Sequence, residues 1–390
     1  MHIVLCREAG EMMADEIEVV AKAMGLTRAR LEKAEGIKNL HKIEWKTRYY
    51  RLSQHAEKAM KGTVVFMAKD GPITIQGFPK IRRIMVLSTG LKGNFPKGCF
   101  VEEKMDGYNV RLVDVDGELA AITRGGIVCP YTTYRLSRLA GMDFFKDNPE
   151  LYLCGEVVGL QNPYQEKSYP EAREFGYFVF DIRRIKDNEP IDVETKHKML
   201  KKYGIQSVPD LGYFGANDGE RLLKIVRKLG EDGREGIVLK SRDMKTQLKY
   251  TSNQSTNRDL FYAFKFYADY GQSFMYRRLV REAFQAHEAG LKGKALDDEA
   301  ARLGKSILIP MIDTINKAEK GVEVTEDFGI DVPSCEFGEE FVDHLNKLGV
   351  KARINKCSAG AGEATLKISR RYPSTNDKTR AYLKGGLSSD

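Results

Sequence analysis

The feature of this sequence that most constrains its fold is a pair of hairpins marked by Asp-Gly turns. In the first, VVFMA and ITIQG flank Asp70-Gly71, and in the second, NVRLVDV and ELAAITR flank Asp116-Gly117. Asp-Gly supplies the positive φ angles that tight hairpin turns need. With a two-residue loop at 116–117, Val115 pairs with Glu118, and the numbers of paired residues sum to 233. These hairpins predict antiparallel sheets.

The rest of the chain alternates between strand-like and helical segments. Further strands are expected at 151–159, 177–182 and 236–240, and helices at about 8–24, 193–203, 218–229 and 259–320. A small mixed unit follows Pro333. We therefore expect an α+β protein in four parts: an N-terminal helical module over 1–62, a sheet domain over 63–258, a helical region over 259–330 and a small α/β module over 331–390.

Composition sets limits on partner and compartment. The 390 residues hold 63 Lys+Arg and 55 Asp+Glu, a net charge of +8, which permits a polyanionic partner without demanding one. No run approaches the ~20 apolar residues of a membrane span, and acidic residues stand where a signal peptide needs apolar ones. We expect a cytoplasmic protein. Six cysteines, none in a CxxC pair or beside a histidine, favour scattered buried thiols over disulfides or zinc.

The most informative stretch is Glu103-Lys104-Met105-Asp106-Gly107-Tyr108-Asn109. Lys-x-Asp-Gly alone is also typical of a surface turn between strands. What strengthens it is the ordered series of polar groups that follows: Arg124-Gly125, Gly155-Glu156, Phe180-Asp181, Glu235 to Lys240, and Lys249.

Together these motifs resemble the covalent nucleotidyltransferase superfamily of polynucleotide ligases and mRNA capping enzymes, over about residues 64–252. Asn109 after the Lys-x-Asp-Gly motif, and the upstream Gly77-Phe78-Pro79-Lys80, are closer to RNA ligases than to DNA ligases. The whole chain is most similar to the archaeal, homodimeric ATP-dependent RNA ligases. The fold that this implies is a nucleotidyltransferase domain with a helical C-terminal region.

The resemblance also implies the chemistry. Lys104 would attack ATP to form lysyl-AMP, AMP would pass to an RNA 5′-phosphate, and a 3′-hydroxyl would displace it, with Mg²⁺ or Mn²⁺ as cofactor. Joining within one RNA or between two is left open. The implied site residues fall into three overlapping groups: Lys104, Asn109, Arg124, Lys240 and Lys249 for catalysis; Glu103, Lys104, Arg111, Arg124, Glu156, Phe180, Glu235, Lys240 and Lys249 for ATP; and Glu156, Asp181 and Glu235 for the metal. Residues 259–320 would form the dimer interface.

Two physical expectations accompany these assignments. A lysine attacks only when neutral, and a free lysine is neutral about one part in a thousand near pH 7.4. Lys240, Lys249, Arg124 and bound Mg²⁺ are therefore expected to lower the pKa of Lys104, because neighbouring cations disfavour another positive charge. The hairpin register also places Asn109 opposite Arg124, with Arg111 two residues along on the same face.

Several alternatives remain open. Lys249-Tyr250-Thr251 departs from the usual Lys-x-Lys of the last motif, so Lys265 competes for that role. An mRNA guanylyltransferase or a DNA ligase should carry a further Arg-x-Asp-Lys motif on an OB domain, which is not found. A non-catalytic RNA-binding protein with a decayed site should have lost charged residues that are present here. A basic aromatic patch fits either RNA contact or an ordinary solvated helix: Tyr270, Phe274, Tyr276, Arg277, Arg278 and Arg281.

Overall fold

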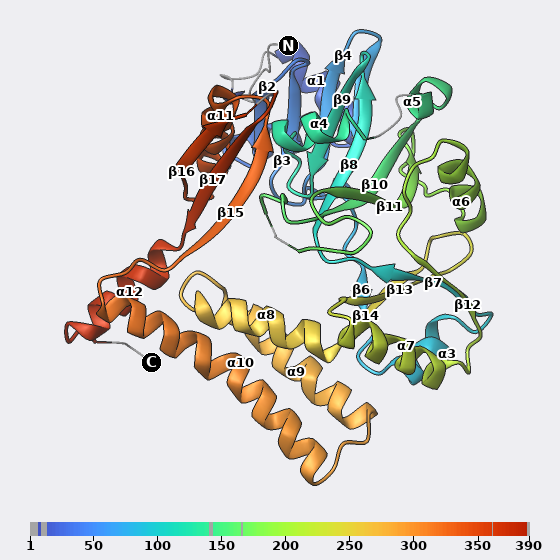
Figure 1. Ribbon diagram of the computed structural model, residues 1–390. Helices are drawn as coiled ribbons and strands as arrows, with labels where there is room; N and C mark the ends of the chain where they lie inside the picture. Colours follow the sequence, from blue (N-terminus) through green and yellow to red (C-terminus); the bar gives the residue numbers. More distant parts are fainter. Residues whose placement is uncertain (1–6, 9–13, 140–142, 165–166, 361, 388–390) are drawn as a thin grey trace.

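The N-terminal part of the molecule is a five-stranded sheet covered by two helices. The computed structural model describes residues 7–8, 14–139, 143–164, 167–360 and 362–387 (Figure 1). The sheet has the order β1-β2-β3-β4-β5. Its elements are β1 (Arg7–Glu8), α1 (Ala14–Met24), α2 (Arg28–Gly36), β2 (Leu40–Glu44), β3 (Tyr49–Leu52), β4 (Val64–Ala68) and β5 (Gly71–Ile75).

This sheet crosses one of the expected boundaries. Tyr50 on β3 pairs with Val65 on β4, and Val20, Leu31 and Tyr50 share one buried cluster. The segment before residue 62 therefore contains strands as well as the expected helices, and the sheet continues beyond it. Apolar residues of α1 and α2 are buried by packing on each other and on these strands, which stabilises helices that are too short to be stable by themselves.

Two sheets form the centre of the molecule. One has the order β11-β10-β8-β9 and the other β12-β7-β13-β14-β6. Their strands are β6 (Arg82–Arg83), β7 (Cys99–Lys104), β8 (Tyr108–Val115), β9 (Glu118–Thr123), β10 (Leu151–Val158), β11 (Gly176–Arg184), β12 (Asp210–Phe214), β13 (Gly236–Lys240) and β14 (Gln247–Thr251). The covering helices are α3 (Leu87–Asn94), α4 (Pro130–Leu136), α5 (Asp143–Asp147), α6 (Val193–Lys202) and α7 (Gly219–Glu231).

The predicted register of the second hairpin is confirmed. Val115 pairs with Glu118 and Val110 with Thr123, so paired numbers sum to 233. Asp116 and Gly117 have φ values of 56° and 84°, the positive angles that the turn requires. The antiparallel α+β fold is confirmed too: of the pairings between named strands in the described residues, one is parallel, between β14 and the short β6.

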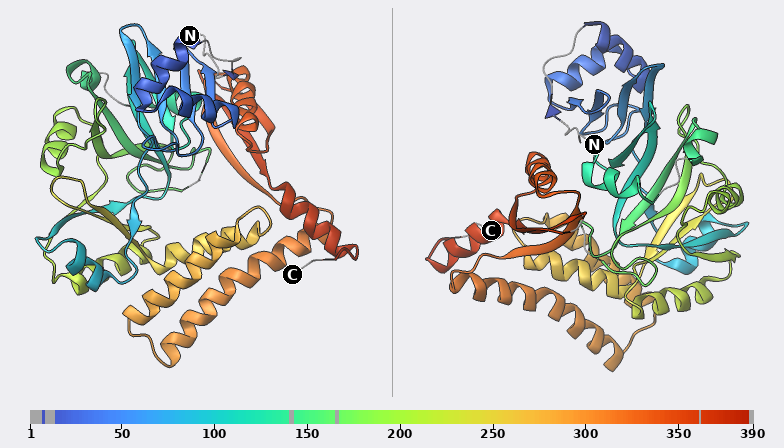
Figure 2. Two further views of the ribbon diagram at one scale, coloured as in Figure 1. Left: turned by 180° about the vertical axis from the view of Figure 1, so that it is seen from behind. Right: turned by 45° about the horizontal axis from the view of Figure 1, so that its top comes forward.

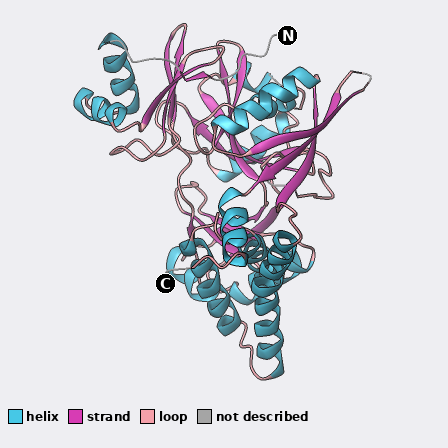
Figure 3. Ribbon diagram, turned by 90° about the vertical axis from the view of Figure 1, so that its left-hand side faces the viewer, coloured by secondary structure: helices cyan, strands magenta, loops and turns pink. Residues whose placement is uncertain are grey.

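Three helices and a small α/β module make up the C-terminal part. The helices are α8 (Asn253–Lys265), α9 (Gln272–Glu288) and α10 (Lys294–Glu319). The module contains β15 (Thr325–Val332), α11 (Cys335–Lys347), β16 (Ala352–Ala359), β17 (Ala364–Arg371) and α12 (Pro373–Leu383), with sheet order β15-β17-β16. The long helices lie at one end of the molecule, away from the N-terminal sheet (Figures 2 and 3). The expected boundary after residue 330 falls inside β15.

The expectation that the cysteines are all free thiols is wrong. Cys335 and Cys357 form a disulfide, with their Cα atoms 5.9 Å apart, while Cys99, Cys129 and Cys154 are buried and free. Cys6 lies outside the described residues. The disulfide joins the start of α11 to β16, which pack together, and the 22-residue spacing follows no disulfide motif. None of the helices in the described part of the chain is long and apolar enough to cross a membrane.

Candidate active site

One cavity of about 700 Å³ collects most of the predicted site residues. Its lining comes from the two central sheets, from α8 and α9, and from β15 and β17 of the C-terminal module. Its volume lies within the range of small-molecule sites. The predicted residues that line it are Glu103, Lys104, Asn109, Arg124, Glu156, Phe180, Glu235, Lys240 and Lys249.

Lys104 ends strand β7, where Gly236 of β13 pairs with it. This pairing brings Glu235 alongside, and Lys104 Nζ lies 2.5 Å from Glu235 Oε2. Burial by itself lowers the pKa of Lys104, but the charges of Glu235 and Glu156 outweigh it, and the pKa is raised. The expected lowering by a ring of cations is therefore wrong for the free protein. The nearest charges are carboxylates, because the strand pairing places Glu235 closer than any cation.

Lys249 provides the contrast. It lies on β14 opposite Val238 of β13, and no carboxylate among the described residues forms an ion pair with it. Burial, together with the charges of Lys104 and Arg83, lowers its pKa to about 8. The lowered lysine pKa expected at position 104 is thus found two strands away, at position 249.

Lys240 is buried in a network of its own. Its Nζ lies 2.5 Å from Glu102 Oε2 and 2.6 Å from the carbonyl oxygen of Phe180. Lys196 of α6 also pairs with Glu102, and both lysines hold the pKa of that carboxyl well below its usual range, although burial alone would raise it. Burial and Lys240 lower the pKa of Lys196 to about 8.

The Phe180 ring faces the cavity from β11. It meets Phe78 edge-on, with ring centroids 5.3 Å apart, and Lys240 Nζ lies 5.9 Å from its centroid. These contacts hold the ring in place at the cavity wall, where an aromatic ring can serve as a stacking surface.

Glu156 supplies the second carboxylate near Lys104. Burial, opposed by Lys104 and reinforced by Glu235 and Asp106, raises the pKa of Glu156 to about 7. One Glu156 oxygen accepts a bond of 3.2 Å from the amide of Gly107. Among the described residues no group of three metal-binding side chains occurs. Glu156 and Glu235 both line the cavity, and one or two carboxylates are enough to hold a hard divalent cation that keeps several of its waters.

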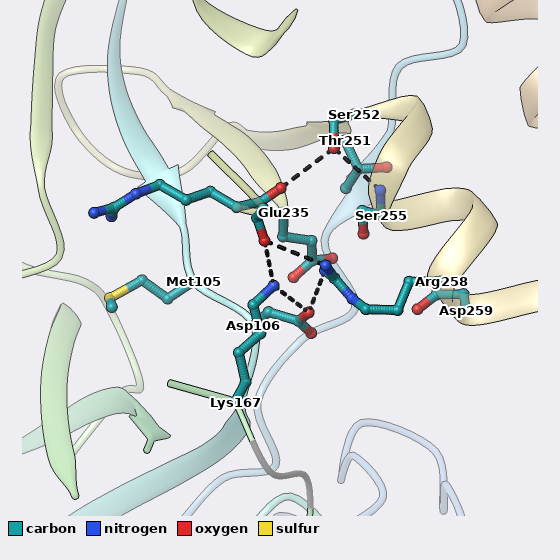
Figure 4. A network of polar contacts seen from close by, with 12 residues as sticks. Met105, Asp106, Lys167, Glu235, Thr251, Ser252, Ser255, Arg258 and Asp259 are labelled. Carbon is teal, nitrogen blue, oxygen red and sulfur yellow. Dashed lines mark hydrogen bonds and ion pairs between the residues drawn. The ribbon is translucent and has the colours of Figure 1, made fainter. Parts of the chain in front are cut away.

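Asp106 is held by two cations that the sequence did not single out. Lys167 Nζ and Arg258 Nη2 donate to the same Asp106 oxygen at 3.1 Å and 2.8 Å (Figure 4). Both cations also donate to the carbonyl of Gly233, at 2.6 Å and 3.2 Å. Arg258 lies on α8, so this contact ties the Lys-x-Asp-Gly motif to the helical region. Neither cation belongs to a sequence motif, and only the fold reveals them.

Three candidates lie outside the cavity lining. The Arg111 guanidinium is fully buried and donates to the carbonyls of Gln76, Gly62 and Thr123 at 2.6, 2.9 and 2.8 Å. Arg111 therefore joins the N-terminal sheet to β8. Asp181 is fully buried outside this lining, and its Oδ2 accepts a hydrogen bond of 2.8 Å from Arg183 Nε. Lys265 stacks on Phe266 at the end of α8, so the geometry favours Lys249 over Lys265.

The basic aromatic patch divides into two. Tyr270, Phe274 and Arg278 line the cavity, whereas Tyr276 and Arg277 are exposed on α9 and lie outside its lining. Arg281 is buried and donates to the Thr251 hydroxyl at 2.8 Å.

Comparisons with known proteins agree with this geometry. Family models described as "RNA ligase" and "Ligase Pab1020 C-terminal region" match residues 97–256 and 262–386. An uncharacterised protein of Methanocaldococcus jannaschii is 33% identical over 388 residues, covering 97% of this chain and 98% of that protein.

Two solved structures match over nearly their whole length. One, described as an archaeal ATP-dependent RNA ligase, has a TM-score of 0.90 and 37% identity, covering 95% of this chain and 99% of that one. A putative ATP-dependent DNA ligase from Aquifex aeolicus has a TM-score of 0.86 and 27% identity, covering 93% and 100%. Sequence motifs, cavity and whole-chain similarity agree, and the chain belongs to the archaeal ATP-dependent RNA ligase family.

Proposed function

We propose that this protein uses ATP to join an RNA 5′-phosphate to an RNA 3′-hydroxyl. The observation that carries the proposal is Lys104, at the end of a central strand, inside one cavity with Arg124, Glu156, Glu235, Lys240 and Lys249. A complete set of charged groups argues against a decayed, purely RNA-binding protein. Helices α8 to α10 follow the last motif, where a guanylyltransferase should carry an OB domain. The archaeal RNA ligase matches the chain at higher identity than the putative DNA ligase does, and this favours RNA ligation.

The first step forms a bond between Lys104 Nζ and the α-phosphorus of ATP and breaks the bond to the β-phosphate, so that pyrophosphate leaves. Nζ must first lose its proton and leave Glu235, which holds it at 2.5 Å in the free protein. Lys249 and Arg124 are proposed to stabilise the negative charge that grows on the phosphate oxygens. The Phe180 ring, which lines the cavity, is proposed to stack on adenine.

The next two steps complete the exchange. An oxygen of the RNA 5′-phosphate attacks the phosphorus of lysyl-AMP, the P–N bond breaks, and Lys104 regains a proton. The RNA 3′-hydroxyl then attacks the activated 5′-phosphorus and AMP leaves. Asn109 is proposed to act in this last step. Asn109 lines the cavity, and its buried Oδ1 has no hydrogen-bond partner among the described residues, which suits a group that awaits a ligand.

Glu156 and Glu235 are the proposed protein ligands of Mg²⁺ or Mn²⁺. When bound, the ion would supply positive charge against the triphosphate. Asp181, which the resemblance also implied, is not part of this proposal because it lies outside the cavity lining.

A homodimer is part of the proposal. On α10 an apolar stripe, formed by Leu308, Ile309, Ile312 and Ile315, is 39–52% exposed. Residues at this spacing share one helix face, and an exposed apolar face of this kind marks an association surface. Sedimentation should show a dimer, and Ile312→Glu should convert it to a monomer. A wild-type monomer at micromolar concentration would contradict the dimer. The cytoplasmic location stays a prediction.

A nucleotide and substrate panel tests the activity. The purified protein should form a covalent adduct with labelled ATP and seal single-stranded RNA that carries a 5′-phosphate. An adduct with GTP but not ATP would make it a guanylyltransferase. Faster sealing of nicked duplex DNA than of RNA would make it a DNA ligase, and no adduct with either nucleotide would refute the covalent mechanism.

A further inference from the structure

The cavity that contains Lys104 has a second, chemically different wall, built by the helical region. Tyr270 lies between α8 and α9, and Phe274 and Arg278 lie on α9. The rings of Tyr270 and Phe274 are 5.2 Å apart. These three residues, called here the aromatic wall, face a cavity whose other lining carries the nucleotidyltransferase motifs.

Arg278 is held as a flat surface. Its guanidinium carbon lies 3.2 Å from the centroid of the Phe274 ring, and its Nε donates to Asp259 at 2.7 Å. Asp259 offsets its charge, so in the free protein Arg278 offers a plane more than an unpaired cation. Guanidinium planes and aromatic rings are the groups on which unpaired RNA bases stack.

We propose that the aromatic wall is the binding site for an unpaired base near the RNA end, through stacking on Phe274, Arg278 and Tyr270. This inference rests on the proposed function, because the occupant must be the strand whose end reaches Lys104. Stacking tolerates any base, since every base has a π-face, so the site would hold RNA ends of varied sequence. An end that is base-paired would first have to open.

Two neighbouring residues on the same helix provide matched controls. Tyr276 and Arg277 repeat the chemistry of Phe274 and Arg278 but are exposed outside the cavity lining; Tyr276 is 68% exposed. The variants are therefore Phe274→Ala and Arg278→Lys, with Tyr276→Ala and Arg277→Lys as controls. Arg278→Lys keeps the charge and removes the plane. Phe274→Leu keeps apolar volume where Phe274→Ala does not fold.

The measurement is sealing of a pre-adenylated single-stranded RNA, with the KM for RNA as the main readout. The wall variants should raise this KM about tenfold, the usual worth of one stacked base, and the controls should leave it within about twofold. Full activity of Arg278→Lys would show a phosphate contact in place of stacking and would overturn the proposal. So would an unchanged KM in Phe274→Ala or Phe274→Leu.

A substrate series locates the base. RNAs that lack the base at the first, second or third position from the 5′ end are compared with intact RNA in wild type and in Phe274→Leu. At the stacked position, the effects of the missing base and of the missing ring on the KM for RNA should not be additive, since each change removes the same contact. Additivity at all three positions would contradict the proposal. Adduct formation with labelled ATP needs no RNA and is measured in parallel. If the wild-type protein forms no adduct, the proposed function is refuted. If it forms the adduct but the base and ring losses are additive at every position, only the aromatic wall proposal is refuted.

Discussion

Two lysines that face the same cavity have opposite surroundings. Lys104 is paired with Glu235 and lies near Glu156 and Asp106, which raise its pKa against the effect of burial. Burial, together with the charges of Lys104, Arg83 and Arg124, lowers the pKa of Lys249 to about 8. Both are lysines on strands of one sheet, separated only by β13. The difference shows that the carboxylate beside an amine, more than the number of cations around it, sets its protonation in the free protein.

The largest expected effect is the loss of the AMP adduct when Lys104, and not Lys249, is the nucleophile that is replaced. Lys104→Ala should reduce the labelled-AMP adduct by more than about 10³-fold, because no other amine is expected to attack. Lys265→Ala, outside the cavity lining, is the control and should keep normal adduct formation. An adduct that persists in Lys104→Ala and disappears in Lys249→Ala would reverse the assignment of the nucleophile.

Lys240, another lysine of the cavity lining, tests how much a buried carboxylate partner contributes to stability. Glu102→Gln leaves Lys196 and Lys240 buried without their shared counter-charge, and should lower the free energy of unfolding by about 3–5 kcal/mol. Urea unfolding measures this. Glu194→Gln, which breaks the exposed pair with Arg242, is the control and should cost less than about 1 kcal/mol. Equal losses in the two variants would show that burial of the pair is unimportant.

Removal of the Glu235 carboxylate should lower the pKa of Lys104. Glu235→Gln removes the charge that raises the pKa of Lys104, so the rise of adduct formation with pH should shift to lower pH. The rate itself should fall, since Glu235 is also a proposed metal ligand. The pH midpoint, measured at low ATP, is therefore the informative quantity. A midpoint that stays in place would disconnect Glu235 from the protonation of Lys104.

The smallest effect concerns Lys249. With a pKa of about 8, Lys249 loses its charge above that pH, and the rate of adduct formation at low ATP should fall there relative to the rate set by Lys104 alone. Lys249→Arg keeps the charge and should remove this alkaline fall, with a change of a few-fold at pH 9. Identical alkaline limbs in the two proteins would mean that Lys249 titrates elsewhere.

Local rules predicted much of the fold. The Asp116-Gly117 turn fixed the register of its hairpin to the residue, because a two-residue loop leaves no freedom in pairing. The same register put Arg111 on a face with Asn109, but the N-terminal sheet covers that position and supplies carbonyls to Arg111. Which face a second sheet covers depends on long-range packing, and the hairpin does not encode it.

The site shows the same division. The ordered motifs located nine cavity residues, since each motif lies on or next to a central strand. Arg258 and the aromatic wall were missed or left open because they reach the cavity only after the helical region packs against the sheet. Lys167 was missed because it lies in the connection between β10 and β11 and belongs to no motif. The disulfide was missed for a related reason: Cys335 and Cys357 meet through the packing of α11 on β16. Packing also explains the pKa of Lys104: Glu156 and Glu235, far from it in sequence, raise a pKa that the sequence had predicted to be lowered.

The Lys104–Glu235 pair has a consequence for how this protein should be profiled. A protonated amine in an ion pair reacts slowly with activated esters, isocyanates and other general acylating reagents, whereas an amine with a pKa of about 8 reacts readily near neutral pH. Chemical mapping of the resting protein would thus mark Lys249 and overlook the residue proposed to carry AMP. The ion pair shields Lys104 from stray electrophiles until the nucleotide arrives, so selectivity for ATP begins before ATP binds.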